Sequence, residues 1–204
     1  MTQVHDFRQQ LAYSEQISCE PFWNAVYRKA FPNMVNHMLC SGDTQGQRMG
    51  VDRIVYLGNN LTIAIDEKKR TKDYGDMLLE YISVDKTGAP GWACKDLAID
   101  YLAYAVMPAK TCHLFPWQML RRVWDAYGKN WIDTAEENER KLKEQRDGKI
   151  SGYVDNGFKR IEAKNKDYST WSVAVPMERF KAKIAVASII DVSNNADLAG
   201  WNVH

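Results

Sequence analysis

The sequence has no apolar run of the length that a membrane-spanning helix needs, and no apolar signal region near its start. We therefore expect a protein of the cytoplasm. Cysteines are few, four in 204 residues, and none forms a CxxC pair, which argues against a structural zinc site and against a disulfide framework. The four histidines lack metal-ligand spacing, and neither a Gly-rich phosphate loop nor a GxSxG elbow occurs. These absences give no support to the common classes of nucleotide-binding protein and serine hydrolase.

An excess of charge of either sign is also missing. Lysine and arginine total 27, aspartate and glutamate total 26, and the net charge is +1. The chain thus lacks the global basic field of many nucleic-acid binders, so any such surface has to be a local patch. What the chain does have is 45% hydrophobic and 11% aromatic residues, enough for one well-buried core. We expect a single domain over residues 1–204.

The most informative segment is a predicted β-hairpin. Residues 51–57 and 61–68 are rich in β-branched and apolar side chains, and the Gly58-Asn59-Asn60 segment between them tolerates positive φ. Charged residues lie at the outer ends of the two strands: Asp52 in the first, and residues 66–69 in the second. Pairing of the strands brings these ends together.

Two registers are compatible with this loop. A three-residue loop places Asp52 opposite Asp66, with Cβ atoms about 4.5–5.5 Å apart. Lys68 then projects from the same face as Asp66, because side chains alternate along a strand. A two-residue loop instead places Asp52 opposite Glu67, with Lys69 as the lysine of that face. Either register collects two acids and a lysine, and two carboxylates at this distance repel each other unless they share a cation.

The arrangement resembles the active-site hairpin of the PD-(D/E)XK nuclease superfamily, which contains many restriction endonucleases, Holliday-junction resolvases and phage or repair nucleases. The matching residues are Asp52 for the first acid, Asp66 for the second and Lys68 for the lysine, in the segment Ile65-Asp66-Glu67-Lys68. Glu67-Lys68-Lys69 is a second match to the same tripeptide. Val51 stands where the motif has proline, a residue that supplies no ligand.

The remaining pattern predicts an α/β (α+β) fold with the αβββαβ core order of that superfamily over about residues 20–115. The resemblance implies a mixed central sheet flanked by helices. A helix starting at Trp117, a charged helical or loop insertion over about 133–167, and a strand and helix over about 168–191 follow. The helical spacing of the last helix extends to Ile190. The core segments are a helix at about 20–30, strands at 51–57, 61–68 and 76–84, a helix at 95–105 and a strand at 111–115.

The resemblance implies a nuclease that hydrolyses phosphodiester bonds of DNA, with RNA as an alternative substrate. Asp52 and Asp66 would bind Mg²⁺, for which Mn²⁺ can substitute, and Lys68 would contact the phosphate or help to activate water. Glu67, or Glu80 in the interior of the third strand, could add a further ligand or catalytic group. If a phage encodes the chain, its expected location is the host cytoplasm. Because many relatives act as dimers, the resemblance also allows a homodimer.

Further residues are expected near the site. Glu20 opens the first helix, where an acid favours the helix dipole; in relatives of the superfamily an acid on this helix sometimes joins the metal site. Five residues beside the hairpin could contact nucleic acid: Gln47, Arg48, Lys69, Arg70 and Lys72.

Two other hypotheses stay open. The chain could be a nuclease-like scaffold without activity that serves as a nucleic-acid or protein binding module. Alternatively, residues 66–69 end a strand in a solvated turn, in which case Asp52 and Asp66 do not converge.

Overall fold

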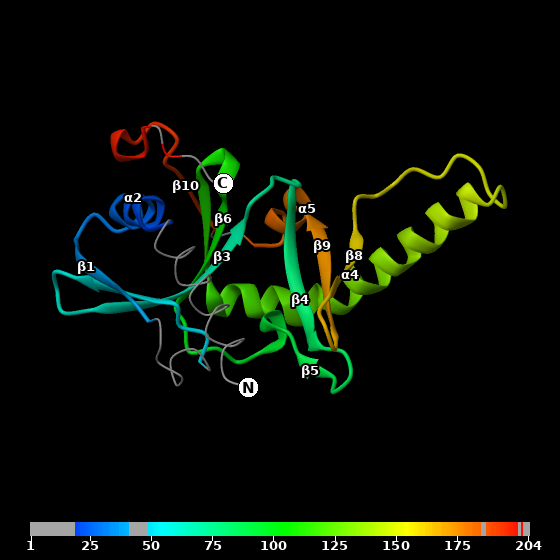
Figure 1. Cartoon of the computed structure of the whole chain (residues 1–204), viewed down its shortest axis with the longest axis horizontal. Coiled ribbons are helices and arrows are strands. Elements are labelled where there is room, and N and C mark those ends of the chain that lie inside the picture. The colour runs from blue at the N-terminus through cyan, green and yellow to red at the C-terminus, as the bar shows by residue number, and fades with distance from the viewer. Residues whose placement is uncertain (1–18, 41–48, 185–186, 200, 202–204) are drawn as a thin grey trace. The chain divides into compact units, whose positions relative to one another are not determined.

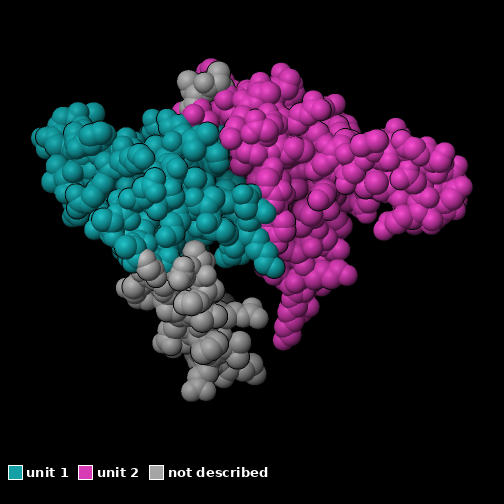
Figure 2. Space-filling model, turned by 90° about the horizontal axis from the view of Figure 1, so that it is seen from above, with its two compact units in different colours: residues 1–73, 98–115, 188–204 teal, residues 74–97, 116–187 magenta. Residues whose placement is uncertain are grey.

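The computed structural model describes residues 19–40, 49–184, 187–199 and 201 (Figure 1). They form a six-stranded mixed sheet and a four-stranded antiparallel sheet, together with helices. The predicted α+β class with a mixed sheet is confirmed. The chain divides into two compact units (Figure 2): residues 1–73, 98–115 and 188–204 form unit 1, and residues 74–97 and 116–187 form unit 2.

Unit 1 contains the six-stranded sheet, in the spatial order β1-β2-β3-β6-β7-β10. Strand β2 is antiparallel to both of its neighbours, β1 and β3; β3 and β6 are parallel, and β10 is antiparallel to β7. The strands are β1 (Met34–Leu39), β2 (Arg53–Leu57), β3 (Thr62–Arg70), β6 (Tyr101–Val106), β7 (Thr111–Pro116) and β10 (Ser188–Asp191), with the short 3-10 helices η2 (Met107–Ala109) and η3 (Ala196–Leu198).

Helix α2 (Glu20–Ala30) has the predicted bounds. Pro21 lies in its first turn, where a missing N–H costs nothing, and Arg28 and Lys29 in the last turn oppose the negative end of the helix dipole. Its apolar face is fully buried in the core of unit 1 through Phe22, Trp23, Ala25, Val26 and Tyr27. This core includes residues from β2, β3, β6, β7 and β10.

The hairpin forms with the three-residue loop. The N–H of Leu57 donates to the Leu61 carbonyl over 2.9 Å, and Asn60 adopts a positive φ of 62°. Strand β2 pairs with β3 through Arg53 opposite Ile65 and Tyr56 opposite Thr62. This is the first of the two predicted registers, so the alternative with a two-residue loop is wrong. Asn tolerates the left-handed conformation that closes such a loop.

The helix predicted at residues 95–105 is wrong, because residues 101–106 are strand β6. Leu102, Ala103, Tyr104 and Ala105 are buried, and β6 lies between β3 and β7 in the sheet. A central strand covered on both faces has a continuous apolar sequence, which cannot be distinguished from a buried helix by its periodicity.

Strand β4 (Asp76–Val84) has the predicted bounds, but it is not part of the hairpin's sheet. It belongs to the four-stranded sheet of unit 2. Residues 71–100, which join β3 to the parallel strand β6, contain no α-helix. The three antiparallel strands that follow α2 are therefore β1, β2 and β3, and not the three segments predicted from the sequence. Strand partners are chosen by the packing of distant segments, which apolar patterns along the chain do not encode.

Unit 2 contains an antiparallel sheet in the order β5-β4-β9-β8, with the long helix α4 packed against it. Gly128 in α4 is required by close packing, because a Cβ atom there would lie 2.8 Å from the indole ring of Trp124. The other elements of the unit are β5 (Ala89–Pro90), η1 (Trp92–Cys94), α4 (Trp117–Arg146), β8 (Lys159–Lys164), β9 (Ser169–Pro176) and α5 (Met177–Lys181).

The C-terminal helix is shorter than predicted. Helix α5 ends at Lys181, and residues 188–191 form β10 instead of continuing the helix to Ile190. Ile189 is exposed and Ile190 is buried, so the segment alternates as an edge strand against β7. Part of the insertion expected at 133–167 belongs to α4, which continues to Arg146, and part forms β8.

Candidate active site

The structure brings Asp52, Asp66 and Lys68 together within unit 1. Asp52 immediately precedes β2, and its Oδ2 accepts a hydrogen bond of 2.8 Å from the backbone N–H of Glu67. Asp66, in β3, forms an ion pair with the Lys68 ammonium, two residues further along the same face. Across the β2–β3 pair Arg53 lies opposite Ile65, so the same register places Asp52 opposite Asp66, and burial and the Asp52 carboxyl both raise the pKa of Asp66. The two acids therefore converge, and the alternative of a solvated strand end is wrong.

Asp66 is the least solvated member of this cluster, with 2% of its surface exposed. Its strand has β2 on one side and β6 on the other, and Asp66 pairs with Leu102 of β6. Burial raises the pKa of Asp66 to about 7, the nearby Lys68 ammonium opposes this, and the Asp52 carboxyl raises the pKa further. Two adjacent carboxyl groups, one of them buried, are stable together when a proton or a cation lies between them.

The donor set fits Mg²⁺ or Mn²⁺. Both cations are bound through hard carboxylate oxygens, and Mg²⁺ commonly uses one or two carboxylates while water and substrate phosphate fill its other positions. Within the described ranges no group of three or more His, Cys, Asp or Glu side chains is arranged to hold a metal ion. Asp52 and Asp66 would hold such an ion as a pair.

Glu67 projects from the opposite face of β3, into a buried polar network. Its Oε1 accepts hydrogen bonds from Tyr27 Oη at 2.8 Å and from Arg53 Nε at 2.5 Å. Arg53 is 1% exposed and also donates to both carboxylate oxygens of Glu20, at 2.8 and 3.0 Å. His37 Nδ1 lies 2.8 Å from Arg53 Nη1. Glu20 is therefore the partner of Arg53 on the face away from Asp66.

The single guanidinium of this network, that of Arg53, contacts the carboxylates of both Glu20 and Glu67. Burial raises the pKa of Glu67, which the Arg53 guanidinium opposes, and burial followed by the charge of Arg53 lowers the pKa of His37. His37 is accordingly neutral at pH 7. This network was not predicted from the sequence, although one signal was present: Arg53 lies two residues before Val55, on the face of β2 that enters the core.

The other predicted residues lie in several places. Glu80 is in β4, opposite Ser172 of β9, and so belongs to unit 2; its role as a ligand stays a prediction. Lys69 is exposed at the end of β3, with Nζ 3.8 Å from Cys19 Sγ, and Lys72 is exposed in the turn that follows. Arg70 is half-buried as the last residue of β3. Gln47 and Arg48 lie outside the described residues.

Comparison of the chain with protein-family models, with curated proteins and with solved structures found no match. Among the helices that the structure describes, none is long and apolar enough to cross a membrane.

Mg²⁺ is expected to raise the melting temperature of the protein. An ion that binds only the folded chain adds about 2.7 kcal/mol to the free energy of unfolding at a hundredfold excess over its Kd, which for a chain of this size is on the order of 5–10 °C. Asp52→Asn should remove the shift and keep the fold, because the amide oxygen can still accept from the Glu67 N–H. Differential scanning fluorimetry with and without Mg²⁺ measures this. Asp133→Asn, a change at an exposed acid of α4, should keep the shift; equal shifts in both variants would argue against the site.

Proposed function

We propose that this protein is a metal-dependent nuclease that hydrolyses phosphodiester bonds of DNA. The observation that carries the proposal is the convergence of Asp52, Asp66 and Lys68 on one face of the hairpin, with Asp66 buried and Lys68 half-buried. The cluster combines carboxylates for a divalent cation with an ammonium for a phosphate. These three residues are the ones on which the resemblance of the sequence to the PD-(D/E)XK superfamily rests.

The proposed division of roles follows from charge. A phosphodiester is negative and repels an attacking hydroxide, so its hydrolysis requires charge neutralisation and an activated water. When bound, Mg²⁺ supplies both by polarising the phosphate oxygen and making water more acidic. Asp52 and Asp66 hold the cation, and Asp52 is fixed by its hydrogen bond from the Glu67 N–H.

Lys68 is suited to the charge that develops on the phosphate. Its side chain is 32% exposed, so the ammonium can reach a substrate while Asp66 keeps it on the correct face of β3. A positioned cation in a partly water-excluded site stabilises the extra negative charge of the transition state. Glu67 has a structural role in this proposal, because Arg53 and Tyr27 hold its carboxylate on the other face.

Cleavage assays should separate the two lysines at the end of β3. Lys68→Gln is expected to lower kcat by about 10²–10³-fold, since a transition-state contact is lost. Lys69→Gln, the same change at the next residue, should leave kcat largely intact, because Lys69 projects from the opposite face of β3. It should raise KM, because an exposed ammonium that attracts the nucleic-acid backbone is lost. A panel of plasmid, linear, single-stranded and branched DNA, and of RNA, incubated with Mg²⁺, Mn²⁺ or EDTA, supplies the measurement.

A matched control is Lys129→Gln, which removes an ammonium that is 88% exposed on α4 and should cut at the wild-type rate. A kcat loss in Lys69→Gln instead of Lys68→Gln would reassign the working pair to Glu67 and Lys69. If the wild type cuts no nucleic acid with either metal, the proposal fails, and a nuclease-like binding module takes its place.

A further inference from the structure

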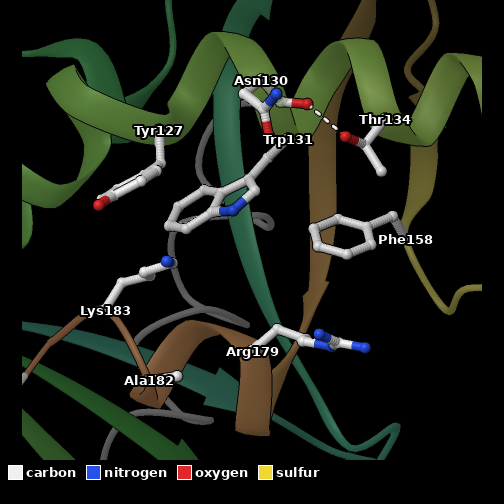
Figure 3. A pocket seen from close by; sticks show the side chains of 8 residues that line it. All are labelled: Tyr127, Asn130, Trp131, Thr134, Phe158, Arg179, Ala182 and Lys183. Atoms are coloured by element: carbon white, nitrogen blue, oxygen red, sulfur yellow. Dashed lines mark hydrogen bonds between the residues drawn. The ribbon is translucent and has the colours of Figure 1, made fainter.

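Unit 2 contains a cavity of about 360 Å³ to which the proposed nuclease site contributes no residue. Figure 3 shows its lining, which includes aromatic rings, a carboxamide and two cationic side chains. The volume lies at the small end of the range of ligand sites, which is about 300–1,000 Å³. The lining residues are Tyr127, Asn130, Trp131, Thr134, Phe158, Arg179, Ala182 and Lys183.

One wall is a single face of α4. Trp131 lies four residues after Tyr127, and Thr134 lies four residues after Asn130, so these side chains project from neighbouring positions on one side of the helix. The rings of Tyr127 and Trp131 stack, with centroids 5.9 Å apart. Trp131 is buried and also contacts Phe180 of α5, with 5.7 Å between ring centroids.

The second aromatic wall is Phe158, and a buried side chain fixes it. Asn138 of α4 is 1% exposed, and its amide nitrogen donates hydrogen bonds of 2.8 Å to the Phe158 carbonyl and to the Asp155 carboxylate. Tyr153 Oη donates to the Asn138 carbonyl oxygen, also over 2.8 Å. The segment that leads into β8 is thereby tied to α4, and Phe158 lies on the opposite side of the indole of Trp131 from Tyr127 (Figure 3).

Arg179 and Lys183 supply positive charge across the cavity from α4 (Figure 3). Lys183 Nζ lies 4.7 Å from the centre of the Tyr127 ring, in a cation–π contact. Within the part of the chain that the structure describes, neither cation forms an ion pair with a carboxylate. Two acids on the adjacent helices form ion pairs with other lysines: Asp133 of α4 pairs with Lys129, and Glu178 of α5 pairs with Lys181.

We propose that this cavity binds one unpaired nucleotide of a single nucleic-acid strand, with its base against the aromatic walls and its phosphate on Arg179 and Lys183. A nucleotide joins a flat π-surface to a negative charge, which is the combination that the cavity complements. A carboxamide beside the walls, at Asn130, can hydrogen-bond to a base edge. A base within a duplex is stacked and paired, so its faces are covered and it does not fit. The site is independent of the proposed cleavage, because its residues all lie in unit 2.

The test is equilibrium binding in EDTA, so that metal-dependent cleavage plays no part. The probes are a fluorescein-labelled 12-nucleotide DNA strand, an RNA strand of the same sequence, and the DNA duplex, each measured by fluorescence anisotropy. Tyr127→Leu removes a half-exposed aromatic face and keeps apolar bulk, and it should weaken single-strand binding roughly 5- to 100-fold. Arg179→Gln/Lys183→Gln should weaken it about as much and reduce the salt dependence by one to two ions.

The control is Lys129→Gln/Arg140→Gln, which removes two charges that already pair with acids on the surface of α4. It should bind like wild type, and duplex binding should be the same in Tyr127→Leu and wild type. Preference for the RNA or the DNA strand identifies which one supplies the nucleotide. Absence of single-strand binding by wild type, Kd values within twofold of wild type for both cavity variants, or equal losses for strand and duplex would each overturn the proposal.

Discussion

Asp66→Asn is expected to lower Mg²⁺-dependent cleavage by about 10²–10³-fold or more and to make the metal-free protein more stable at pH 8. The activity falls because a carboxamide is a far weaker ligand for a hard cation than a carboxylate. The fold survives, because the Asn oxygen can still accept a hydrogen bond from Lys68. The two effects have opposite signs, which distinguishes a functional acid from a structural one.

The stability effect depends on pH in a definite direction. Burial raises the pKa of Asp66 from 3.8 to about 7 in the folded chain. Below about pH 4 this carboxyl is protonated whether the chain is folded or not, so it does not alter stability. From about pH 4 to 7 the unfolded chain releases the proton first, and the free energy of unfolding falls as pH rises. Above about pH 7 Asp66 is ionised in both states, and the free energy of unfolding is lower than at pH 4 by a constant amount, on the order of a few kcal/mol.

Urea denaturation of wild type and Asp66→Asn in EDTA, at pH 5 and at pH 8, measures this difference. The variant should exceed wild type clearly at pH 8 and much less at pH 5, where the folded wild type keeps its proton. Other titrating groups cancel, since both proteins contain them. A variant that is less stable than wild type at pH 8 would show that ionised Asp66 supports the fold, contrary to the burial argument.

Arg53→Met is expected to destabilise the protein by about 3–5 kcal/mol. We expect no larger loss of stability from the removal of any other single charged side chain. Glu67, whose side chain is 6% exposed, would keep a buried carboxylate without its guanidinium partner. Glu20 is 39% exposed and can turn to solvent, so the loss of its guanidinium partner costs less stability than the same loss at Glu67. Chemical denaturation of the single variant gives the number.

A double-mutant cycle identifies the cause of the loss. Arg53→Met/Glu67→Gln should recover much of the stability, because the glutamine is neutral and still accepts the hydrogen bond from Tyr27. The matched control, Arg140→Met, breaks ion pairs of a 54% exposed guanidinium on α4 and should reduce stability far less than Arg53→Met, because solvent screens the exposed pairs. Losses of equal size for Arg53→Met and Arg140→Met, or a double variant no more stable than Arg53→Met, would contradict a buried, coupled network.

The two predictions concern opposite faces of the same hairpin. Asp52 and Asp66 project from one face, and their chain neighbours Arg53 and Glu67 project from the other. The buried pair of Arg53 and Glu67 links β2 to β3 through side chains, next to the acids that we propose as metal ligands. Loss of Arg53 should therefore also loosen the spacing of Asp52 and Asp66, and Mg²⁺ affinity in the surviving folded protein should fall.

The features that the sequence predicted correctly rest on local signals. Helix α2 was predicted with both bounds because apolar residues recur at helical spacing after Pro21 and because Pro32 ends the pattern. The hairpin was found because its loop residues tolerate positive φ and lie between two apolar strands. Asp52, Asp66 and Lys68 followed from the register and from the alternation of side chains along a strand.

The features that the sequence did not predict depend on distant partners. Strand β8 is mostly exposed and lacks apolar alternation, so only its pairing with β9 defines it. Residues 101–106 have a composition that suits either a helix or a covered strand, and their place beside β3 decides between the two.

The sequence by itself determined the helix α2, the hairpin and the two acids and lysine that the hairpin collects, because chain neighbours and a three-residue loop fix these positions. Only the tertiary structure decided that β4 joins the sheet of unit 2, that Glu67 is held by Arg53 and Tyr27, and that a cavity forms between α4 and the residues around α5. The physical reason is that these contacts join residues far apart in the chain, where the burial of whole surfaces outweighs local preference.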